Sequence, residues 1–189
     1  MTAHPKLSII TVVKNDRTGL QRTVESLRNQ DFSDFEHIII DGNSTDGTKE
    51  WITKLDPPPS QWISESDQGV YDAMNKGLDR AKGEWIYFLN AGDHLAAAHA
   101  LSRIVSKMKA DIHLVYWDIE RVLESGEKQL WEQKPIYKMG LFNNICHQAL
   151  WYNRKLIGPF RFDTRFNIAA DANLLIQLLG NYRPLRYFR

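Results

Sequence analysis

The first half of this chain alternates strand-like and helix-like segments, and this rhythm limits the folds that are open to it. Three apolar runs, at residues 7–13 (LSIITVV), 35–40 (FEHIII) and 85–89 (WIYFL), are rich in β-branched and aromatic side chains, and a shorter run lies at 61–64. Such runs are typical of parallel strands that are covered on both faces. Strand–helix–strand repeats of this length require right-handed crossovers. We therefore predict an α/β fold with a mostly parallel central sheet flanked by helices.

The segments between these strands carry apolar residues at helical spacing. The predicted helices contain Leu20, Val24 and Leu27; Trp51, Ile52 and Leu55; and Val70, Met74, Leu78 and Ala81. Ser44 or Thr45 is expected to cap the second helix, which Pro57 ends, and Gly83 is expected to end the third.

The second half has a different pattern, which predicts a smaller antiparallel element. We expect a helix over 96–109, antiparallel strands over 112–123 and 128–133 joined at Ser125-Gly126, an irregular stretch over 135–166, and a short helix opened by Asp171 and ended by Gly180. No internal repeat separates the two halves, so residues 1–189 are expected to form a single domain.

Three acidic residues, Asp41, Asp67 and Asp93, each follow a predicted strand at even spacing along the chain. The carboxyl ends of parallel strands share one edge of a sheet, and ligands bind there, so we expect the three carboxylates to lie along that edge. Each one alone is more commonly a turn residue. A phosphate-accepting receiver domain also gathers carboxylates at this edge, but it needs an acidic pair where this chain has Lys14-Asn15-Asp16.

Composition and missing motifs exclude several function classes. A net charge of +1 gives no reason to expect nucleic-acid binding. No apolar run reaches the roughly eighteen residues of a membrane span, and the start, MTAHPKLSII, is not expected to be a secretory signal. Cys146 is the only cysteine, which fits a reducing cytoplasm. GxxxxGK[ST] and GxGxxG loops do not occur, which argues against P-loop and Rossmann proteins.

Four ordered blocks resemble the family 2 glycosyltransferases, the inverting enzymes of the GT-A fold: LSIITVVKND, IIIDGNSTDGT, SESDQGVYDAMNKGLDRAKGEWIYFLNAGD and HQALWYNRKLIGPFRFDTRF…AADANLLIQL. The resemblance covers about residues 6–180 and is closest to bacterial enzymes that build exopolysaccharide, capsule or O-antigen. It implies a GT-A fold with a nucleotide-sugar donor half over about 6–95 and an acceptor half over about 96–180. It also implies transfer of a sugar, most often from a UDP-sugar, to a hydroxyl of a glycan or lipid-linked acceptor, with inversion.

The resemblance implies roles for residues on the donor side. The first strand would end beside the nucleoside at Thr11 and Val13. Asp41 would accept a hydrogen bond from the base N–H, a task that suits a carboxylate because it only accepts; the alternative is that Asp41 caps its own turn. Asp67 stands where the family places polar contacts to the nucleoside, and Asn75 would reach ribose or phosphate.

The turn Asn90-Ala91-Gly92-Asp93 departs from the Asp-x-Asp metal motif of many nucleotide-sugar enzymes, because an Asn replaces the first acid. Mg²⁺ keeps several waters and needs only one or two carboxylates besides substrate phosphates. We therefore expect Asp93 to hold Mg²⁺ or Mn²⁺ with the help of the donor diphosphate, and metal to bind weakly without nucleotide. Asn90 would add a neutral oxygen or contact the sugar. His147 is a further candidate for metal, diphosphate or acceptor, and His94 a weaker one.

Inversion in one displacement needs a base that takes the acceptor proton. The family supplies it from a Glu-Asp pair before a short apolar helix. Here the pair reads Ala170-Asp171, so Asp171 is the expected base. Asp171 would also suit the N-cap of its helix, and the two roles are compatible because a helix N-terminus favours an ionised carboxylate. Four aromatic residues could stack on sugar rings, although most are expected in the core or rim: Trp117, Trp131, Trp151 and Tyr152.

The last residues, 181–189 (NYRPLRYFR), form a basic aromatic tail that could touch an anionic membrane surface, where lipid-linked acceptors reside. Family members often continue further, so the chain is expected to be short or truncated. We expect a cytoplasmic enzyme, at most peripheral to the inner face of the membrane. Two alternatives stay open. A non-catalytic nucleotide-sugar-binding module would explain the altered metal turn and Ala170, and a sugar nucleotidyltransferase would share the ligand but lacks its glycine-rich, Arg-containing loop here.

Overall fold

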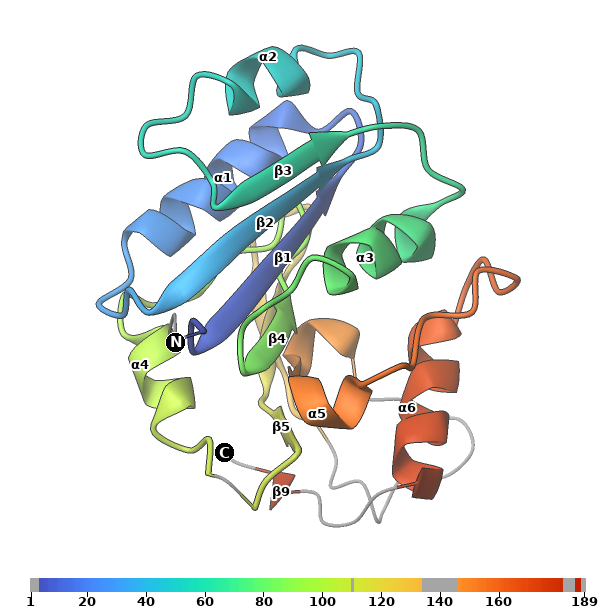
Figure 1. Ribbon diagram of the computed structural model, residues 1–189. Helices are drawn as coiled ribbons and strands as arrows, with labels where there is room; N and C mark the ends of the chain where they lie inside the picture. Colours follow the sequence, from blue (N-terminus) through green and yellow to red (C-terminus); the bar gives the residue numbers. More distant parts are fainter. Residues whose placement is uncertain (1–3, 110, 134–145, 182–185, 188–189) are drawn as a thin grey trace.

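The computed structural model describes residues 4–109, 111–133, 146–181 and 186–187. Its centre is a seven-stranded sheet in the order β3-β2-β1-β4-β8-β5-β9 (Figure 1). The first four neighbours are parallel, and their bounds are β1 (Leu7–Val13), β2 (Phe35–Asp41), β3 (Gln61–Ser64) and β4 (Trp85–Phe88). The predicted parallel sheet is therefore confirmed for the first half of the chain.

The second half of the chain completes the same sheet. Its strands are β5 (Leu114–Tyr116), β8 (Leu150–Asn153) and β9 (Arg186–Tyr187). β8 lies between β4 and β5 and runs antiparallel to both, whereas β9 is parallel to β5. The prediction of an irregular stretch over 135–166 is wrong in its described part, where β8 is followed by α5 (Arg154–Ile157). Four fully buried residues carry no period that separates a strand from a loop or a helix.

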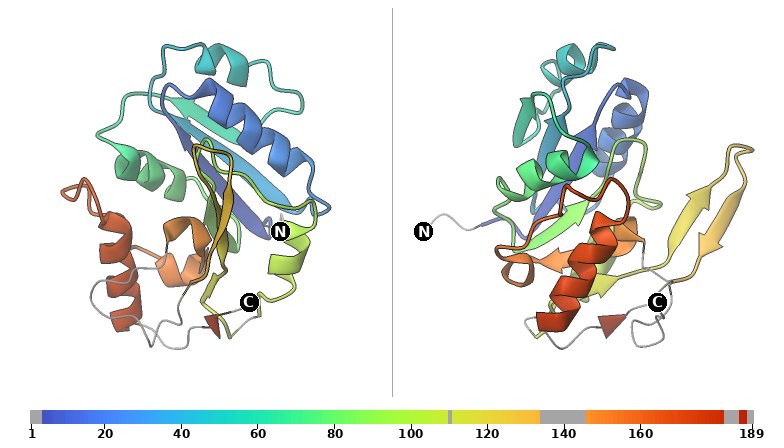
Figure 2. Two further views of the ribbon diagram at one scale, coloured as in Figure 1. Left: turned by 180° about the vertical axis from the view of Figure 1, so that it is seen from behind. Right: turned by 90° about the vertical axis from the view of Figure 1, so that its right-hand side faces the viewer.

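Helices cover both faces of the sheet (Figures 1 and 2). Besides α5, the helices are α1 (Arg17–Arg28), α2 (Thr48–Ile52), α3 (Val70–Leu78), α4 (Ala100–Val105) and α6 (Ala170–Asn181). Side chains alternate along β1. Leu7 and Ile9 therefore share a buried cluster with residues of α1 and α4, while Ile10 and Val12 share another with residues of α3, α5 and α6. The result is a three-layer α/β/α arrangement.

Several predicted helix ends differ from the observed ones. α2 begins at Thr48 after Gly47, and no side chain caps it, because the Ser44 hydroxyl bonds to Asp41 instead. α3 ends at Leu78, five residues before Gly83. The helix expected over 96–109 is confined to α4.

A two-stranded hairpin, β6 (Ile119–Val122) and β7 (Lys128–Trp131), stands apart from the main sheet and projects from the body (Figure 2, right). The predicted strand over 112–123 is thus two strands: β5 joins the main sheet and β6 joins the hairpin. The side chain of Asp118, between them, accepts a hydrogen bond of 2.7 Å from the backbone N–H of Gln133. The predicted small antiparallel element is confirmed.

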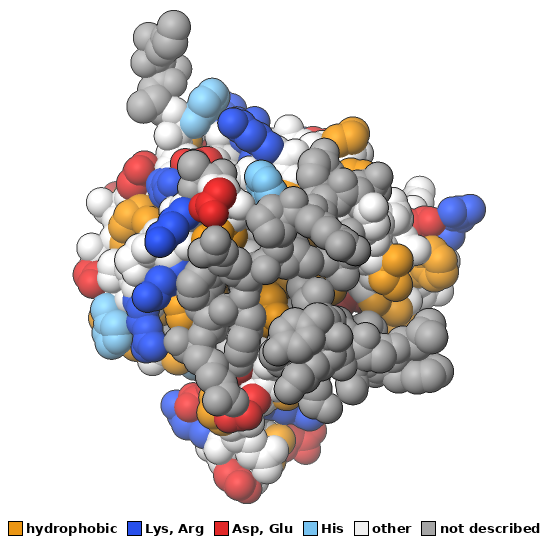
Figure 3. Space-filling model, turned by 90° about the horizontal axis from the view of Figure 1, so that it is seen from below, with side chains coloured by type: hydrophobic (Ala, Val, Ile, Leu, Met, Phe, Trp, Pro, Cys, Tyr) orange, Lys and Arg blue, Asp and Glu red, His pale blue; other side chains and the backbone are white. Residues whose placement is uncertain are grey.

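Within the described ranges, no helix is both long and apolar enough to cross a membrane. Most of the predicted basic tail lies outside the described residues; its Arg186 and Tyr187 form β9. On the face shown in Figure 3, basic side chains lie along one margin with acidic side chains beside them.

Candidate functional site

The first acidic residue of the predicted edge, Asp41, ends β2 and is fully buried. Its Oδ1 accepts a hydrogen bond of 2.5 Å from the Ser44 hydroxyl, and its Oδ2 accepts one of 2.6 Å from the hydroxyl of Ser64, at the end of β3. The backbone N–H of Ser44 donates to the same carboxylate. A buried carboxylate needs such donors. Asp41 therefore caps its own turn, which is one of the two roles expected from the sequence.

Asp67 lies three residues beyond β3 and packs against Gly42, the residue after Asp41. A Cβ at Gly42 would lie 2.2 Å from Oδ2 of Asp67, so a larger residue here would force the Asp67 side chain to move. Oδ1 of Asp67 accepts a hydrogen bond of 3.0 Å from the Gly69 N–H, and Nζ of Lys14 lies 3.6 Å away. Asp41 and Asp67 thus occupy adjacent positions at the carboxyl edge of the sheet, as the strand pattern predicts.

The side chains of Thr11 and Asn75 make contacts inside the protein. Thr11 is fully buried, with its hydroxyl 2.9 Å from Nε2 of His37. The Asn75 amide forms two hydrogen bonds of 2.9 Å with the backbone of Phe162, donating to its carbonyl and accepting from its N–H. Val13 is also buried. Asn75 therefore ties α3 to the segment after α5, a role with no sequence signal because the partner is backbone.

The turn that carries Asp93 follows β4 and is fastened to α1. The buried Thr23 hydroxyl donates to the Asp93 carbonyl at 2.7 Å and accepts from the Gly92 N–H at 3.2 Å. Gly92 has a φ of 93°, a left-handed conformation that favours glycine. Thr23 therefore helps to place Asp93, although its position in the sequence marks it only as a helix residue.

The electrostatics around the Asp93 carboxyl group are mixed. Burial raises its pKa, and this effect is opposed by the neighbouring His147 and His94 and by a hydrogen bond from Gln148. A carboxylate whose ionised form is disfavoured by burial is stabilised when a cation binds to it.

Four polar side chains from four separate segments meet where the two halves of the chain face each other. His147 begins the 3₁₀ turn η2 (His147–Ala149). Its Nδ1 lies 3.4 Å from Oδ2 of Asp171, and its Nε2 lies 3.3 Å from the amide nitrogen of Asn90. The Tyr71 hydroxyl donates to Oδ1 of Asp171 at 3.2 Å. Asn90, His147 and Asp171 are all candidates from the sequence, whereas Tyr71 carries no signal beyond its place on α3.

Asp171 is the second residue of α6, so its alternative role as the N-cap is not observed. The residue before the helix, Ala169, has a φ of 71°, which costs about 1–2 kcal/mol for a residue other than glycine. Burial would raise the pKa of Asp171, but hydrogen bonds from His147, the backbone of Ala172 and Tyr71 outweigh it and hold the pKa below its ordinary value. Asp171 is thus ionised at neutral pH, as a proton acceptor must be.

A cavity of about 900 Å³ adjoins Asp93 and separates the β6–β7 hairpin from α4. Its lining includes Leu95, Ile104, Trp117, Ile119, Trp131 and Gln148. Among the candidate aromatic residues, Trp131 is 48% exposed, whereas Trp151 is buried against Tyr87, with 3.8 Å between ring centroids, and Tyr152 is fully buried. Trp131 is therefore the most accessible of these rings.

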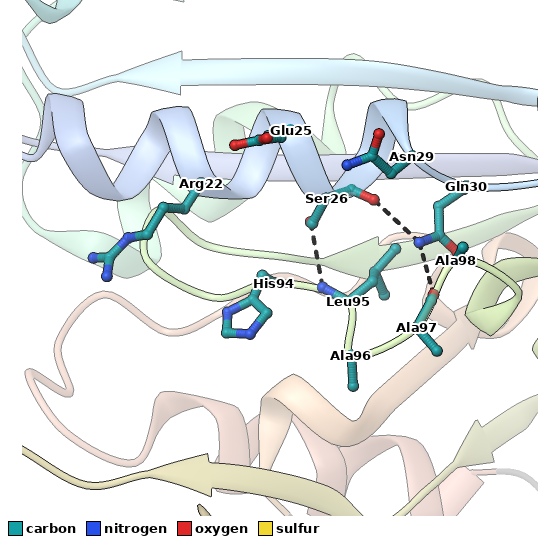
Figure 4. Close-up of a pocket in the computed structure, with 10 residues that line it drawn as sticks. All are labelled: Arg22, Glu25, Ser26, Asn29, Gln30, His94, Leu95, Ala96, Ala97 and Ala98. Carbon is teal, nitrogen blue, oxygen red and sulfur yellow. Dashed lines mark hydrogen bonds between the residues drawn. The ribbon is translucent and has the colours of Figure 1, made fainter. Parts of the chain in front are cut away.

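A smaller cavity of about 440 Å³ lies between α1 and residues 94–98 (Figure 4). Arg22 and His94 extend on the same side of it, and both also line the larger cavity. The Gln30 amide donates to the carbonyls of Ser26 and Ala97, which fastens this loop to α1.

The residues around Asp93 fit a divalent cation that a nucleotide substrate helps to hold. Among the described residues, no group of three or more His, Cys, Asp and Glu side chains could hold a metal ion. Oδ1 of Asn90 is buried and has no hydrogen-bond partner among the described residues. An unsatisfied buried oxygen is costly, and carboxylate and amide oxygens are suitable ligands for Mg²⁺ and Mn²⁺. Asn90 and Asp93 thus have the right chemistry for a metal whose other ligands are phosphate oxygens and water.

Comparison with known proteins identifies the family. The model of glycosyl transferase family 2 matches residues 8–171. A PGL/p-HBAD biosynthesis glycosyltransferase of Mycobacterium bovis is 33% identical over 185 residues, which cover 95% of this chain and 72% of that protein. A GalNAc(5)-diNAcBac-PP-undecaprenol beta-1,3-glucosyltransferase of Campylobacter jejuni is 37% identical over 107 residues, which cover 54% of this chain and 34% of that protein.

Solved structures share the fold at low sequence identity. S. aureus TarS 1–349 in complex with UDP superposes with a TM-score of 0.76 at 19% identity, covering 97% of this chain and 57% of that one. The mannosyltransferase PcManGT from Pyrobaculum calidifontis, in complex with GDP-Man and Mn²⁺, gives a TM-score of 0.74 at 18% identity, covering 97% and 55%. This chain spans little more than half of either structure. The chain is a glycosyltransferase with the GT-A fold, and it belongs to glycosyltransferase family 2.

Proposed function

We propose that this glycosyltransferase moves a sugar from a UDP-sugar to a hydroxyl of a glycan or lipid-linked acceptor, with inversion at the anomeric carbon, in bacterial cell-surface glycoconjugate synthesis. The observation that carries the proposal is the contact of one imidazole with both halves of the chain. Nδ1 of His147 lies 3.4 Å from Oδ2 of Asp171, and its Nε2 lies 3.3 Å from the amide nitrogen of Asn90, in the turn that carries Asp93. A single displacement needs a group that stabilises the departing diphosphate and a base that takes the proton of the incoming hydroxyl. In this proposal Asp93 serves the diphosphate and Asp171 serves the hydroxyl.

In the proposed step, the acceptor hydroxyl oxygen attacks the anomeric carbon of the donor sugar. The new carbon–oxygen bond forms while the bond from that carbon to the β-phosphate oxygen breaks, and its electron pair leaves with UDP. The hydroxyl proton passes to the carboxylate of Asp171. Attack from the face opposite the leaving group inverts the anomeric centre. Asp171 suits this role because it is ionised and is held by donors from His147 and Tyr71.

On the donor side, Asp41 and Asp67 would contact the nucleoside, with the backbone at Thr11 and Val13 beside it. Asp93 and Oδ1 of Asn90, which has no partner within the described ranges, would hold Mg²⁺ or Mn²⁺ together with the diphosphate. When bound, the cation would neutralise charge on the departing diphosphate. The UDP in the TarS complex, and the GDP-Man and Mn²⁺ in the PcManGT complex, support a nucleotide donor and a metal on this fold.

The cavity between the hairpin and α4 would receive sugar rings of the acceptor beyond the reacting hydroxyl. Its lining includes Asp93 and Gln148, which is next to His147 in the chain, and it offers the ring of Trp131 together with polar side chains such as Arg121 and Glu120. Aromatic rings beside hydrogen-bonding groups suit sugar rings, which have apolar faces and polar edges. The -PP-undecaprenol in the name of the Campylobacter relative supports a lipid-linked acceptor as one possibility.

Calorimetric titration of UDP tests the donor site, with Mn²⁺, with Mg²⁺ and with EDTA. We expect binding that requires the metal, and at least a tenfold loss of metal-dependent affinity in Asp93→Ala, because that change removes the only carboxylate of the turn. Glu50→Ala, which removes an exposed carboxylate on α2, is the control and should bind as the parent does. Tight binding that ignores EDTA would exclude Asp93 as a metal ligand.

Assays of sugar transfer and of UDP-sugar hydrolysis distinguish an enzyme from a non-catalytic binding module. We expect slow release of free sugar from UDP-sugars by the parent protein, and a loss of about 10²–10⁴-fold in Asp171→Asn, whose amide cannot take a proton. Binding of UDP-sugars without any transfer or hydrolysis would favour the non-catalytic module. Failure of UDP, GDP and dTDP to bind would contradict the proposed donor site altogether.

A further inference from the structure

We infer that His147 is a positioning residue for Asp171, which orients the proposed base and does not itself bind the metal or the diphosphate. The inference rests on the proposed function, since it assigns a role within the same transfer. It concerns a contact that crosses the molecule, from the turn after β4 through η2 to α6.

Both ring nitrogens of His147 already have partners. With the proton on Nδ1, the imidazole donates toward Oδ2 of Asp171, 3.4 Å away, and Nε2 accepts from the amide nitrogen of Asn90 at 3.3 Å. One neutral tautomer satisfies both contacts. A metal ion would have to displace Asn90 or Asp171 to reach a ring nitrogen of His147, whereas Oδ1 of Asn90 has no hydrogen-bond partner to give up among the described residues.

The Asp171 carboxylate needs outside support to hold one orientation. It stands in the first turn of α6, and about a fifth of its side chain is exposed. The Tyr71 hydroxyl, from α3, donates to Oδ1 at 3.2 Å, and Nδ1 of His147, from η2, lies 3.4 Å from Oδ2. A base must be within hydrogen-bond reach of the hydroxyl it deprotonates, and a displacement of about 1 Å costs about 10²-fold in rate.

The same contact connects the base to the donor turn. Asn90 belongs to the turn that carries Asp93. Its amide nitrogen faces His147, while its oxygen has no hydrogen-bond partner among the residues that the structure describes. An amide held in this direction selects the tautomer of His147 that donates to Asp171. The orientation of the base is therefore set from the side of the site where the donor binds.

Three variants test this role, with turnover and Michaelis constants measured for whichever UDP-sugar and acceptor the parent uses, or with UDP-sugar hydrolysis alone. His147→Ala should lower kcat by about 10²-fold and leave the Michaelis constant of the donor within about twofold. His147→Asn, which can still donate from near the Nδ1 position, should restore part of kcat, and so should imidazole added to His147→Ala. His99→Ala, an exposed histidine before α4, is the control and should match the parent.

A double-mutant cycle gives the decisive result. A residue that acts only through Asp171 has nothing left to act on in Asp171→Asn, so adding His147→Ala there should change kcat by less than about twofold. If the two losses multiply, His147 acts independently and the inference is wrong. A tenfold loss of Mn²⁺-dependent UDP affinity in His147→Ala, in protein with an unchanged Tm, would also overturn it by making His147 a metal or diphosphate ligand. Absence of donor binding in the parent would instead reject the proposed function.

Discussion

Buried polar residues at the carboxyl edge of the sheet hold their neighbours in place and also lie near the proposed nucleoside site. Asp41 collects donors from Ser44 and Ser64, and the hydroxyl of Thr11 faces His37 one strand away. Each contact joins two strands or a strand and its turn. For a substitution at this edge, both the stability of the protein and its ligand affinity should therefore be measured.

Asp41→Asn should weaken the binding of uridine by about tenfold, with or without metal, because a hydrogen bond to a charged acceptor contributes about 1.5–3 kcal/mol. Uridine lacks the diphosphate, so calorimetry with this ligand reports on the nucleoside site alone. Ser64→Ala is the matched control, since it removes one donor to Asp41 but keeps the charge. Unchanged uridine binding together with a lower Tm would leave Asp41 only its capping role.

His37 should make the protein less stable in mild acid. Burial, and then the charge of Arg28, lower its pKa from 6.5 to about 4. The folded pKa is below the unfolded one, so the stabilisation from a neutral His37 is complete above pH 6.5 and is lost as the pH falls toward 4. The free energy of unfolding should drop by about 1.4 kcal/mol per pH unit in that window, or about 2 kcal/mol between pH 7 and pH 5.

Urea unfolding of the parent and of His37→Gln, at pH 7 and pH 5, isolates this contribution. Other titrating groups act equally in both proteins, so the parent should lose about 2 kcal/mol more than the variant. Equal losses in the two proteins would show that His37 is not held neutral in the folded state.

Among the secondary-structure elements, β8 has the largest effect on the site. It is inserted between β4 and β5, and Trp151 from β8 stacks on Tyr87 from β4 with the ring planes 2° apart. η2, which carries His147, leads directly into β8. Pairing of β8 with β4 thus carries His147 to the turn that holds Asn90 and Asp93.

The connection between α3 and β4 depends on one glycine. Gly83 is buried against β1, and a Cβ there would lie 2.4 Å from the backbone nitrogen of Ser8. Backbone atoms of a central strand cannot move aside, so Gly83→Ala should lower the free energy of unfolding by about 2–3 kcal/mol. Gly180→Ala is the matched control: it meets no atom within 4 Å and lies in α6, where alanine favours the helix, so stability should be unchanged or slightly higher. Equal effects of the two substitutions in urea unfolding would contradict this packing.

At the scale of the whole molecule, the first and second halves of the chain share one sheet and one buried cluster. β8 from the second half pairs with β4 from the first, and a single buried cluster includes Ile10, Met74, Tyr152 and Leu174. We propose on this basis that the chain is a single domain. Of the strands in the described part of the chain, only β6 and β7 stand outside the main sheet.

A shared core predicts one cooperative unfolding transition. The urea curves from tryptophan fluorescence and from far-ultraviolet circular dichroism should coincide, because neither half can lose its strands without breaking the sheet. Backbone amides of the hairpin should exchange with solvent faster than those of β1 and β8. Two separated transitions would show that the halves are independent folding units.

Local sequence patterns determined the fold of the first half of this chain. β1 and β3 lie where the apolar runs predict them, and Asp41 and Asp67 follow their strands to a common edge. A strand buried on both faces needs an unbroken apolar run, so the sequence records it directly. The turn proposed to hold the metal could also be predicted, because Asn90 and Asp93 lie only three positions apart in the chain.

The tertiary structure alone decided the acceptor side. The insertion of β8, the support of Asp93 by Thr23 and the meeting of Tyr71, His147 and Asp171 join residues that are far apart in the sequence. Periodicity shows which face of an element is buried, but not which distant element covers it. The four buried residues of β8 show no periodic pattern, and neither does a single polar contact. Only the packing of the complete chain therefore specifies their positions.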